Sequence, residues 1–372
     1  MTLLVQNPPR TVADLTPPLL TELLGGAFPG AVVASARPRS THQGTTTHVH
    51  LDLTYEAGSP ADAPQQVFVK TELSTVDDLP DEFVTALSEG SEGASILLAE
   101  QRFYREIAPS LDLELLRVFA SEPVPGPAQF LILAEDVTQR GATFPDPAGT
   151  QTPDQVAALL RTLAHLHAPF WDSPRLRDGG DLAWLDSPVD GLFTAFLRTD
   201  GWALIRMLLD EPYKVPLLEA TGLDADGMEK AFWASQEVFA RDPRTLLHGD
   251  PHPGNVYRLP DGTTGLLDWQ LVRRGSWVHD VAYAIVGALD PSVRAAAERD
   301  LLAGYLAELR HQGIAAPVLD DAYALYRCAP PWGFAMWAIA PGVMYSDALI
   351  GAVLERFAVA IRELGTAEQL GL

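Results

Sequence analysis

The pattern of apolar residues changes once along the chain, near residue 136. Before that point the side chains alternate between apolar and polar, which is typical of half-buried strands. Strands are predicted over residues 48–55 and 65–71, and the continuous apolar run QFLILA over 129–134 indicates a strand that is buried on both sides. In the first of these strands one face carries Val49, Leu51, Leu53 and Tyr55.

After residue 136 the apolar residues recur with the period of a helix. The clearest helix starts at Thr152, because Thr152 and Gln155 form a capping box and Pro153 occupies the first helical position. The sequence therefore predicts an α+β fold with two lobes. Residues 1–135 form an N-terminal lobe built on an antiparallel sheet, and residues 136–372 form a larger, mainly helical lobe.

Composition excludes several classes of function. The chain has 26 Lys and Arg against 49 Asp and Glu, a formal net charge of −23 that repels phosphate backbones and anionic lipids. Neither nucleic acid nor a membrane is therefore expected as a partner. Cys328 is the only cysteine, so no internal disulfide and no zinc site of several thiolates can form. Residues 329–346 lack charge, but their prolines and glycines favour broken helices that line a cavity over a membrane span. With no targeting signal in residues 1–10, a cytoplasmic location is expected.

The segment 246–269, LLHGDPHPGNVYRLPDGTTGLLDW, carries the most information about function. Pro260-Asp261-Gly262 lies between two short strand-like runs, and proline followed by glycine in this order predicts a hairpin turn. Such a turn would place Asn255 and Asp268 opposite each other, or one register apart, at the open end of the hairpin.

Oxygen ligands at these positions favour a hard cation. Asp250 lies five positions before Asn255, on the Pro- and Gly-rich loop that leads into the hairpin. Carboxylate and amide oxygens without cysteine select Mg²⁺ or Mn²⁺, which usually complete their coordination with substrate phosphates. A carboxylate that is not used as a ligand can orient and deprotonate an attacking hydroxyl group. The arrangement therefore suits phosphoryl transfer.

The spacing of these residues resembles the catalytic region of the aminoglycoside phosphotransferase and choline-kinase-like superfamily, which is related to the protein kinases. The resemblance implies a two-lobed protein-kinase-like fold. It implies that Asp250 is the catalytic base or hydroxyl-orienting group and that Asn255 and Asp268 hold Mg²⁺. His248 resembles the histidine that anchors the catalytic loop, and Asp280 resembles the structural aspartate that holds this loop in place.

The N-terminal lobe offers an independent test, because a kinase-like lobe needs a strand lysine for the nucleotide and a helical glutamate to hold it. Lys70 follows Val67-Phe68-Val69 on a predicted strand, on the same face as Phe68. Glu100 lies among apolar residues on the core-facing side of a helix predicted over 95–108. A carboxylate there is costly unless it is paired, and Lys70 is its natural partner.

Other nucleotide contacts carry weaker signals. Gly44 and Thr45 lie where a loop would cover the phosphates, although this loop has one glycine in place of three. Glu135 lies where backbone groups would meet the adenine. The aromatic residues Trp332, Trp337 and Tyr345 either line the acceptor pocket or pack in a helix core.

Several alternatives stay open from the sequence alone. Asp280 can also cap a helix over 281–289, and Lys70 can be a surface lysine. The preferred function is an ATP- and Mg²⁺-dependent kinase for the hydroxyl of a small molecule similar to an aminoglycoside, choline or another metabolite. A nucleotide-binding pseudokinase that acts as a scaffold is an alternative, and so is a metal-dependent hydrolase that uses His248, Asp250 and His252. The acceptor, the choice between ATP and GTP, the oligomeric state and a role in resistance or metabolism are not determined.

Overall fold

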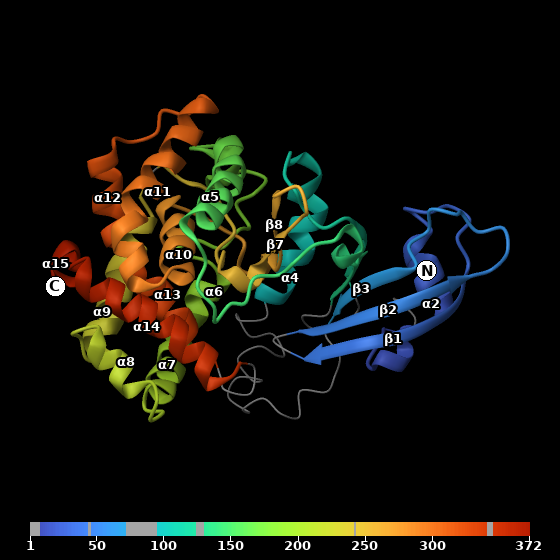
Figure 1. The fold of residues 1–372 in the computed structure, drawn as a ribbon, viewed down its shortest axis with the longest axis horizontal. Coiled ribbons are helices and arrows are strands. Elements are labelled where there is room, and N and C mark those ends of the chain that lie inside the picture. The colour runs from blue at the N-terminus through green and yellow to red at the C-terminus, as the bar shows by residue number, and fades with distance from the viewer. Residues whose placement is uncertain (1–7, 44–45, 72–94, 124–129, 242, 341–344) are drawn as a thin grey trace. The chain divides into compact units, whose positions relative to one another are not determined.

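A computed structural model describes most of the chain and separates it into two units (Figure 1). Unit 1 consists of residues 1–110 and 115–142, and unit 2 consists of residues 111–114 and 143–372. The described residues are 8–43, 46–71, 95–123, 130–241, 243–340 and 345–372. Gly44 and Thr45, the two residues expected to cover phosphates, lie outside them.

Unit 1 is built on one antiparallel sheet of five strands in the order β1-β2-β3-β5-β4. The strands are β1 (Val33–Gln43), β2 (Thr47–Tyr55), β3 (Gln66–Thr71), β4 (Val118–Pro123) and β5 (Phe130–Glu135). Burial alternates along most of β2, as expected for a strand with one face on the core. The predicted antiparallel sheet is confirmed, and its register places His48 opposite Lys70 and Lys70 opposite Ile132.

One face of this sheet is covered by α2 (Pro17–Leu24), which the sequence analysis did not predict and which follows the 3₁₀ turn Val12–Asp14. The helix starts with two prolines, which suit the first helical positions because these need no hydrogen bond from their nitrogen atoms. Its four leucines are buried against apolar side chains of the sheet, including Val49, Leu51 and Val69. The face that carries Val49, Leu51 and Val69 is therefore the core face of this sheet.

The helix that carries Glu100 is composite. It begins as α4 (Ser95–Arg102), continues as a π-helical turn over Phe103–Ile107 and ends in a 3₁₀ turn over Ala108–Ser110. A continuous helix was expected over 95–108. The segment is helical, but its second half has the wider π-helical geometry. Phe103, Tyr104 and Ile107 of the π turn are buried.

Helices make up most of unit 2. The predicted helix α5 (Pro153–His167) is confirmed, including the capping box in which the side chains of Thr152 and Gln155 each accept from the other's backbone N–H. The other α-helices are α6 (Leu192–Phe196), α7 (Trp202–Leu209), α8 (Val215–Ala220), α9 (Ala225–Phe239), α10 (Val278–Ala288), α11 (Pro291–His311), α12 (Leu319–Arg327), α13 (Pro330–Ala338), α14 (Asp347–Glu363) and α15 (Thr366–Leu370).

The centre of unit 2 is α10, in which all 11 residues are buried. Helices α5, α11, α12, α13 and α14 pack around it, and Figure 1 shows α10 among them. The helix begins at Val278, so Asp280 lies in its first turn and is not its N-cap, which is Trp277. The alternative role of Asp280 as a helix cap is therefore wrong, and its carboxylate has other partners.

The hairpin predicted around Pro260-Asp261-Gly262 is confirmed. Strands β7 (Val256–Arg258) and β8 (Thr264–Leu266) pair with Val256 opposite Leu266. Gly262 has a φ of +87°, the conformation that the turn requires and that glycine adopts without strain. Two further short strands, β6 (Thr245–Leu247) and β9 (Arg273–Gly275), pair with each other and flank the loops on either side of the hairpin.

In the uncharged segment 329–346, α13 occupies residues 330–338 and is largely buried, while residues 341–344 are outside the description. Among the described residues, no helix has the length and apolar character needed to span a membrane.

Candidate functional site

The loop that follows β6 carries His248, Gly249 and Asp250, and α10 holds it by its backbone. The carboxylate of Asp280 accepts hydrogen bonds from the N–H of His248 at 2.7 Å and from the N–H of Gly249 at 2.9 Å. Burial alone would raise the pKa of Asp280, but the hydrogen bond and charge of His167 outweigh it and lower this pKa below its ordinary value. Asp280 is therefore ionised at neutral pH and holds two backbone N–H groups of this loop.

His248 links this loop to the segment that carries Asp268. Its Nδ1 accepts from the N–H of Asp250 at 3.2 Å, and its Nε2 donates to the carbonyl of Leu267 at 2.8 Å. Burial lowers the pKa of His248, so the ring is neutral, as the first of these hydrogen bonds requires.

The environment of Asp250 disfavours the ionised form of its carboxylate. Its side chain is 15% exposed, and burial raises its pKa to about 7. Hydrogen bonds from Tyr283 and from Nδ2 of Asn255, the latter at 3.0 Å, oppose this shift, while the negative charge of Asp268 adds to it. A general base with a pKa near the working pH is the most effective one.

Asn255 and Asp268 lie at the open end of the hairpin. The N–H of Leu267 donates to the carbonyl of Asn255 at 2.8 Å, so Asp268 lies one position beyond the residue opposite Asn255. The amide nitrogen of Asn255 donates to the backbone carbonyl and to the carboxylate of Asp250, which leaves its side-chain oxygen as the atom for a cation.

Asp268 has a φ of +59°, in the left-handed region that residues other than glycine rarely adopt. Such backbone strain is common in functional sites, because the surrounding structure must hold the residue in place. The carboxylate of Asp268 also raises the pKa of Asp250, so two negative groups influence each other here. A cation would relieve their repulsion.

The histidines of this loop do not fit a zinc centre. Both ring nitrogens of His248 form hydrogen bonds within the protein. Nδ1 of His252 accepts from the N–H of Gly254 at 3.0 Å, and burial lowers the pKa of His252 to about 4. Within the described part of the chain, no group of three or more His, Cys, Asp or Glu side chains is arranged to hold a metal ion. The hydrolase alternative therefore lacks its ligands.

In unit 1, the structure brings Lys70 and Glu100 together as an ion pair. Lys70 is on β3, Glu100 is on α4, and each residue is 3% exposed. Lys70 is therefore not a surface lysine. A buried ion pair contributes little net stability, because removing both charges from water costs about as much as their attraction returns.

The sheet face that carries Lys70 also carries three aromatic rings that the sequence analysis did not select. The ring of Phe68 lies 5.4 Å from that of His48 and 5.3 Å from that of His50, measured between centroids. His50 also contacts the carboxylate of Asp136 at 3.1 Å. The three rings are only partly buried, and both histidine rings are tilted against the ring of Phe68, two positions from Lys70.

The backbone N–H and the carboxylate of Glu135 both form hydrogen bonds within unit 1. Its N–H donates to the carbonyl of Arg117 at 2.9 Å, and its carboxylate accepts from the N–H of Arg117 and from the guanidinium of Arg140. The backbone N–H of Glu135 is therefore engaged within unit 1, and the expected contact of its backbone with adenine stays a prediction.

The three aromatic residues proposed for the acceptor pocket lie in different environments. Trp332 is 1% exposed and packs in the core of unit 2, the alternative that the sequence left open. Trp337 packs edge-on against His252 with the ring centroids 5.1 Å apart, and against Tyr345 at 5.6 Å. Tyr345 is 36% exposed. Trp337 and Tyr345 therefore lie near the Asp250 loop, with Tyr345 facing solvent.

Three residues of the site were missed because they come from distant segments; two contact the loop and the third contacts Asp280. Tyr283 hydrogen-bonds to Asp250 from α10. His279 is close enough to donate to the carbonyl of Gly249, at 3.2 Å. His167, at the end of α5, contacts Asp280 at 3.2 Å and the hydroxyl of Tyr305 at 2.7 Å. For His167, the signal in the sequence was a histidine at a buried position of a predicted helix.

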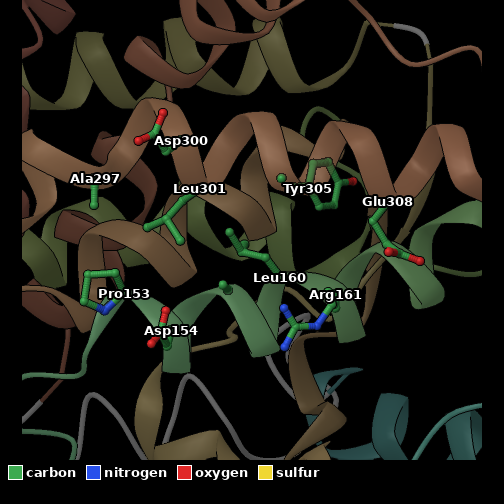
Figure 2. Close-up of a pocket in the computed structure, with 11 residues that line it drawn as sticks. Pro153, Asp154, Leu160, Arg161, Ala297, Asp300, Leu301, Tyr305 and Glu308 are labelled. Atoms are coloured by element: carbon green, nitrogen blue, oxygen red, sulfur yellow. The ribbon is translucent and has the colours of Figure 1, made fainter.

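A pocket of about 330 Å³ lies between α5 and α11 and contains none of the predicted site residues (Figure 2). Leu160 and Tyr305 line it together with the charged side chains of Asp154, Arg161 and Glu308. Tyr305 of this pocket contacts His167, which in turn contacts Asp280, the residue that holds the Asp250 loop.

Comparison with known proteins gives a family and a set of solved structures. The model of the "Phosphotransferase enzyme family" matches residues 73–315, more than half of the chain. No curated protein matches the sequence. A choline kinase from Streptococcus pneumoniae is 12% identical, with 94% of this chain and 98% of that chain covered and a TM-score of 0.49.

Two further solved structures are similar at the same level. An aminoglycoside phosphotransferase from Alicyclobacillus acidocaldarius is 14% identical, covers 90% of this chain and 92% of its own, and has a TM-score of 0.43. A macrolide 2′-phosphotransferase from Brachybacterium faecium is 15% identical, covers 90% and 97%, and has a TM-score of 0.43.

Proposed function

Because the chain belongs to the phosphotransferase enzyme family, we propose that it transfers the γ-phosphoryl group of Mg·ATP to a hydroxyl group of a small molecule. The protein is a small-molecule phosphotransferase; the nucleotide, the metal, the acceptor and the role of each residue are parts of the proposal. The observation that carries it is the geometry of the hairpin: Nδ2 of Asn255 donates to the carboxylate of Asp250 at 3.0 Å, and Asn255 lies opposite Leu267, the neighbour of Asp268.

Asp250 would orient the acceptor hydroxyl and take its proton. In a direct transfer the acceptor oxygen forms a bond to the γ-phosphorus, the bond from this phosphorus to the β-phosphate oxygen breaks, and ADP leaves. The proton of the hydroxyl goes to a carboxylate oxygen of Asp250, whose pKa of about 7 suits this exchange. No phosphorylated enzyme forms.

Asn255 and Asp268 would hold the magnesium ion through their side-chain oxygens. The donor set fits this metal, since it contains only oxygen and has room for the phosphates of the nucleotide. When bound, Mg²⁺ neutralises charge that develops on the phosphates. The two hydrogen bonds from Asn255 to Asp250 would keep the base in a fixed position relative to these ligands.

The predicted lobes 1–135 and 136–372 would bind the nucleotide and the acceptor, respectively. Lys70, held by Glu100, would pair with the α- and β-phosphates. The partly buried ring of Phe68, on the same face of the sheet, would support the base. Gly44 and Thr45 keep their proposed place over the phosphates.

The acceptor would bind near Trp337 and Tyr345. Aromatic faces next to acidic groups suit a protonated or quaternary amine as well as a flat apolar alcohol. Choline-like and aminoglycoside-like alcohols are therefore the first candidates, and other hydroxyl-bearing metabolites are the second.

Replacement of Asp268 tests the proposal. We expect Asp268→Ala to abolish ADP release from Mg·ATP while the melting temperature stays close to that of the wild type. Asp261→Asn is the matched control, because Asp261 is an exposed carboxylate on the turn of the same hairpin, and it should retain full activity. Near-wild-type turnover by Asp268→Ala would show that the metal site is assigned wrongly.

The acceptor is found by a screen of hydroxyl-bearing metabolites and antibiotics for acceptor-stimulated ADP release. Stimulation by one class of alcohol that depends on Asp250 would support the proposal. A thermal shift with Mg·ATP without ADP release for any alcohol would instead favour a nucleotide-binding scaffold.

A further inference from the structure

Trp332 lies at the start of α13, 83 residues from the catalytic loop in sequence, yet its ring is in contact with that loop. The ring stacks on Phe232 of α9, with centroids 5.8 Å apart and planes 20° apart, and packs edge-on against Phe193. With 1% exposure, the side chain cannot touch an acceptor molecule. Its only polar atom, Nε1, donates to the carbonyl oxygen of Gly249 at 3.2 Å.

The Gly249 carbonyl belongs to the peptide group that leads directly into Asp250. It is within 3.2 Å of two donor nitrogens, Nε1 of Trp332 and Nε2 of His279. The N–H of the same peptide group donates to Nδ1 of His248. Both polar ends of this peptide are therefore held, so its plane cannot rotate without breaking hydrogen bonds in a buried environment.

The backbone at Gly249 cannot position Asp250 by itself. Gly249 has a φ of +88°, a conformation that glycine enters and leaves more easily than any other residue. Without contacts at its carbonyl, rotation at this glycine would move the α-carbon of Asp250 and hence its carboxylate. A displacement of about 1 Å at a reacting group can cost roughly a hundredfold in rate.

A buried cation strengthens the contact from Trp332. The guanidinium of Arg273 lies 4.5 Å from the centre of the indole ring, on the face of its π system. A positive charge in this position withdraws electron density from the ring and makes its N–H a better donor. Burial lowers the pKa of the neighbouring His279 to about 3, so this ring is neutral and has a single N–H to offer.

We propose that Trp332 is a positioning residue of the phosphotransferase reaction, which fixes the orientation of Asp250 by donating a hydrogen bond to the Gly249 carbonyl. The proposal rests on the function proposed for Asp250. Trp332 contacts neither substrate, so its loss lowers the rate of the chemical step and leaves substrate binding largely unchanged.

Two replacements of Trp332 test this role. Trp332→Phe keeps an aromatic ring on Phe232 and removes the N–H. Site-specific incorporation of 3-benzothienylalanine keeps the shape of the ring system and replaces the N–H with sulfur, so it also serves if the phenylalanine variant fails to fold. Trp202→Phe is the control, because Trp202 is a buried tryptophan that packs against the same Phe232 and whose Nε1 has no partner among the described residues.

The activity is ADP release from Mg·ATP, with water as the acceptor and with the alcohol that stimulates it most. We expect kcat to fall roughly tenfold or more with either replacement of Trp332, with KM for ATP and the alcohol within about threefold of the wild type. Trp202→Phe should keep kcat within about twofold of the wild type, although it should lose about as much thermal stability as Trp332→Phe. The proposal is wrong if the benzothienylalanine protein keeps the wild-type kcat, or if it mainly raises KM for the alcohol.

Asp250→Asn separates this proposal from the function on which it rests. In one outcome the wild type releases ADP, the Asp250→Asn variant does not, and the benzothienylalanine protein has the activity of the wild type. Only the role of Trp332 then fails. If the wild type releases no more ADP than Asp250→Asn, the proposed function fails and the role of Trp332 fails with it.

Discussion

In unit 1 the ammonium of Lys70 lies against the carboxylate of Glu100, and the two side chains are 4% and 5% exposed. In unit 2 the side chain of Asp250 is 15% exposed and has the carboxylate of Asp268 as a repulsive neighbour. The first site therefore contains equal and opposite charges. The second contains negative charge that hydrogen bonds from neutral groups only partly stabilise.

This difference in charge balance indicates which of the two sites a bound ion would stabilise. A neutralised pair such as Lys70–Glu100 is complete by itself, and its lysine is preorganised for an anion. A carboxylate whose pKa is raised by a second carboxylate, as that of Asp250 is by Asp268, gains stability when a cation binds beside the two groups. The proposed function therefore gives the two sites different needs: the ammonium of Lys70 is already paired, whereas the carboxylates of the unit 2 site would be stabilised by the proposed metal ion.

The largest effect is expected when the pair in unit 1 is broken. Lys70→Met leaves the carboxylate of Glu100 buried and unpaired, which should reduce the free energy of unfolding by about 3–5 kcal/mol. The double variant Lys70→Met/Glu100→Leu should recover most of this loss, as measured by urea denaturation. Arg102→Met on the same helix removes an exposed ion pair with Glu106 and should cost less than about 0.5 kcal/mol. Equal losses in the single and double variants would contradict the view that the pair is internally balanced.

The next effect concerns Asp250 and depends on pH. The folded protein keeps the proton on Asp250 up to about pH 7, whereas the unfolded chain releases it near pH 3.8. The folded state therefore binds more protons in this window, and stability falls as the pH rises through it and is level above pH 7. Asp250→Asn removes this fall, so its stability relative to the wild type should rise by about 3 kcal/mol between pH 5 and pH 8.

The control for this prediction is Asp290→Asn. Asp290 caps α11, and its hydrogen bonds to Ser292 lower its pKa, so it is ionised throughout the range. Asparagine caps helices about as well, and the effect of this substitution should not change between pH 5 and pH 8. A pH-independent effect of Asp250→Asn in urea denaturation would mean that Asp250 is ionised at pH 5.

The smallest effect compares two glycines with nearly equal φ angles, +88° at Gly249 and +87° at Gly262. A β-carbon at Gly249 would lie 2.0 Å from the carbonyl oxygen of Leu271, whereas nothing lies within 4 Å of one at Gly262. Gly262→Ala should cost about 1 kcal/mol for its left-handed conformation, and Gly249→Ala about 2 kcal/mol more. Thermal denaturation measures the loss of stability in each variant. Equal losses would show that the loop at Gly249 rearranges to accommodate the methyl group.

Local patterns in the sequence were sufficient for the hairpin and for α5. Turn residues and capping residues act within a few positions of each other, so Pro260–Gly262 and Thr152–Gln155 determine their elements without the rest of the chain. The Lys70–Glu100 pair was also predicted, because a charged residue among apolar ones requires a partner. In contrast, α2 is only eight residues long and was too short to give a clear period.

The contacts that hold the Asp250 loop were not predictable in the same way. Trp332 and His279 reach the Gly249 carbonyl across 83 and 30 residues of sequence. Whether a tryptophan in an uncharged segment faces a pocket or the core depends on how α13 packs against α9 and α10, which no local pattern contains. The π-helical turn after α4 likewise changes which residues face inward without a turn signal in the sequence.

The four residues 111–114 interrupt unit 1 and belong to unit 2, where the hydroxyl of Tyr257 donates to Glu114 at 2.7 Å. During synthesis on the ribosome, this short stretch emerges long before the tyrosine that contacts it. No single cut of the polypeptide yields both units intact, since a fragment that starts at residue 143 lacks Glu114. Work with isolated halves of this protein would therefore require a graft of residues 111–114 onto the second fragment.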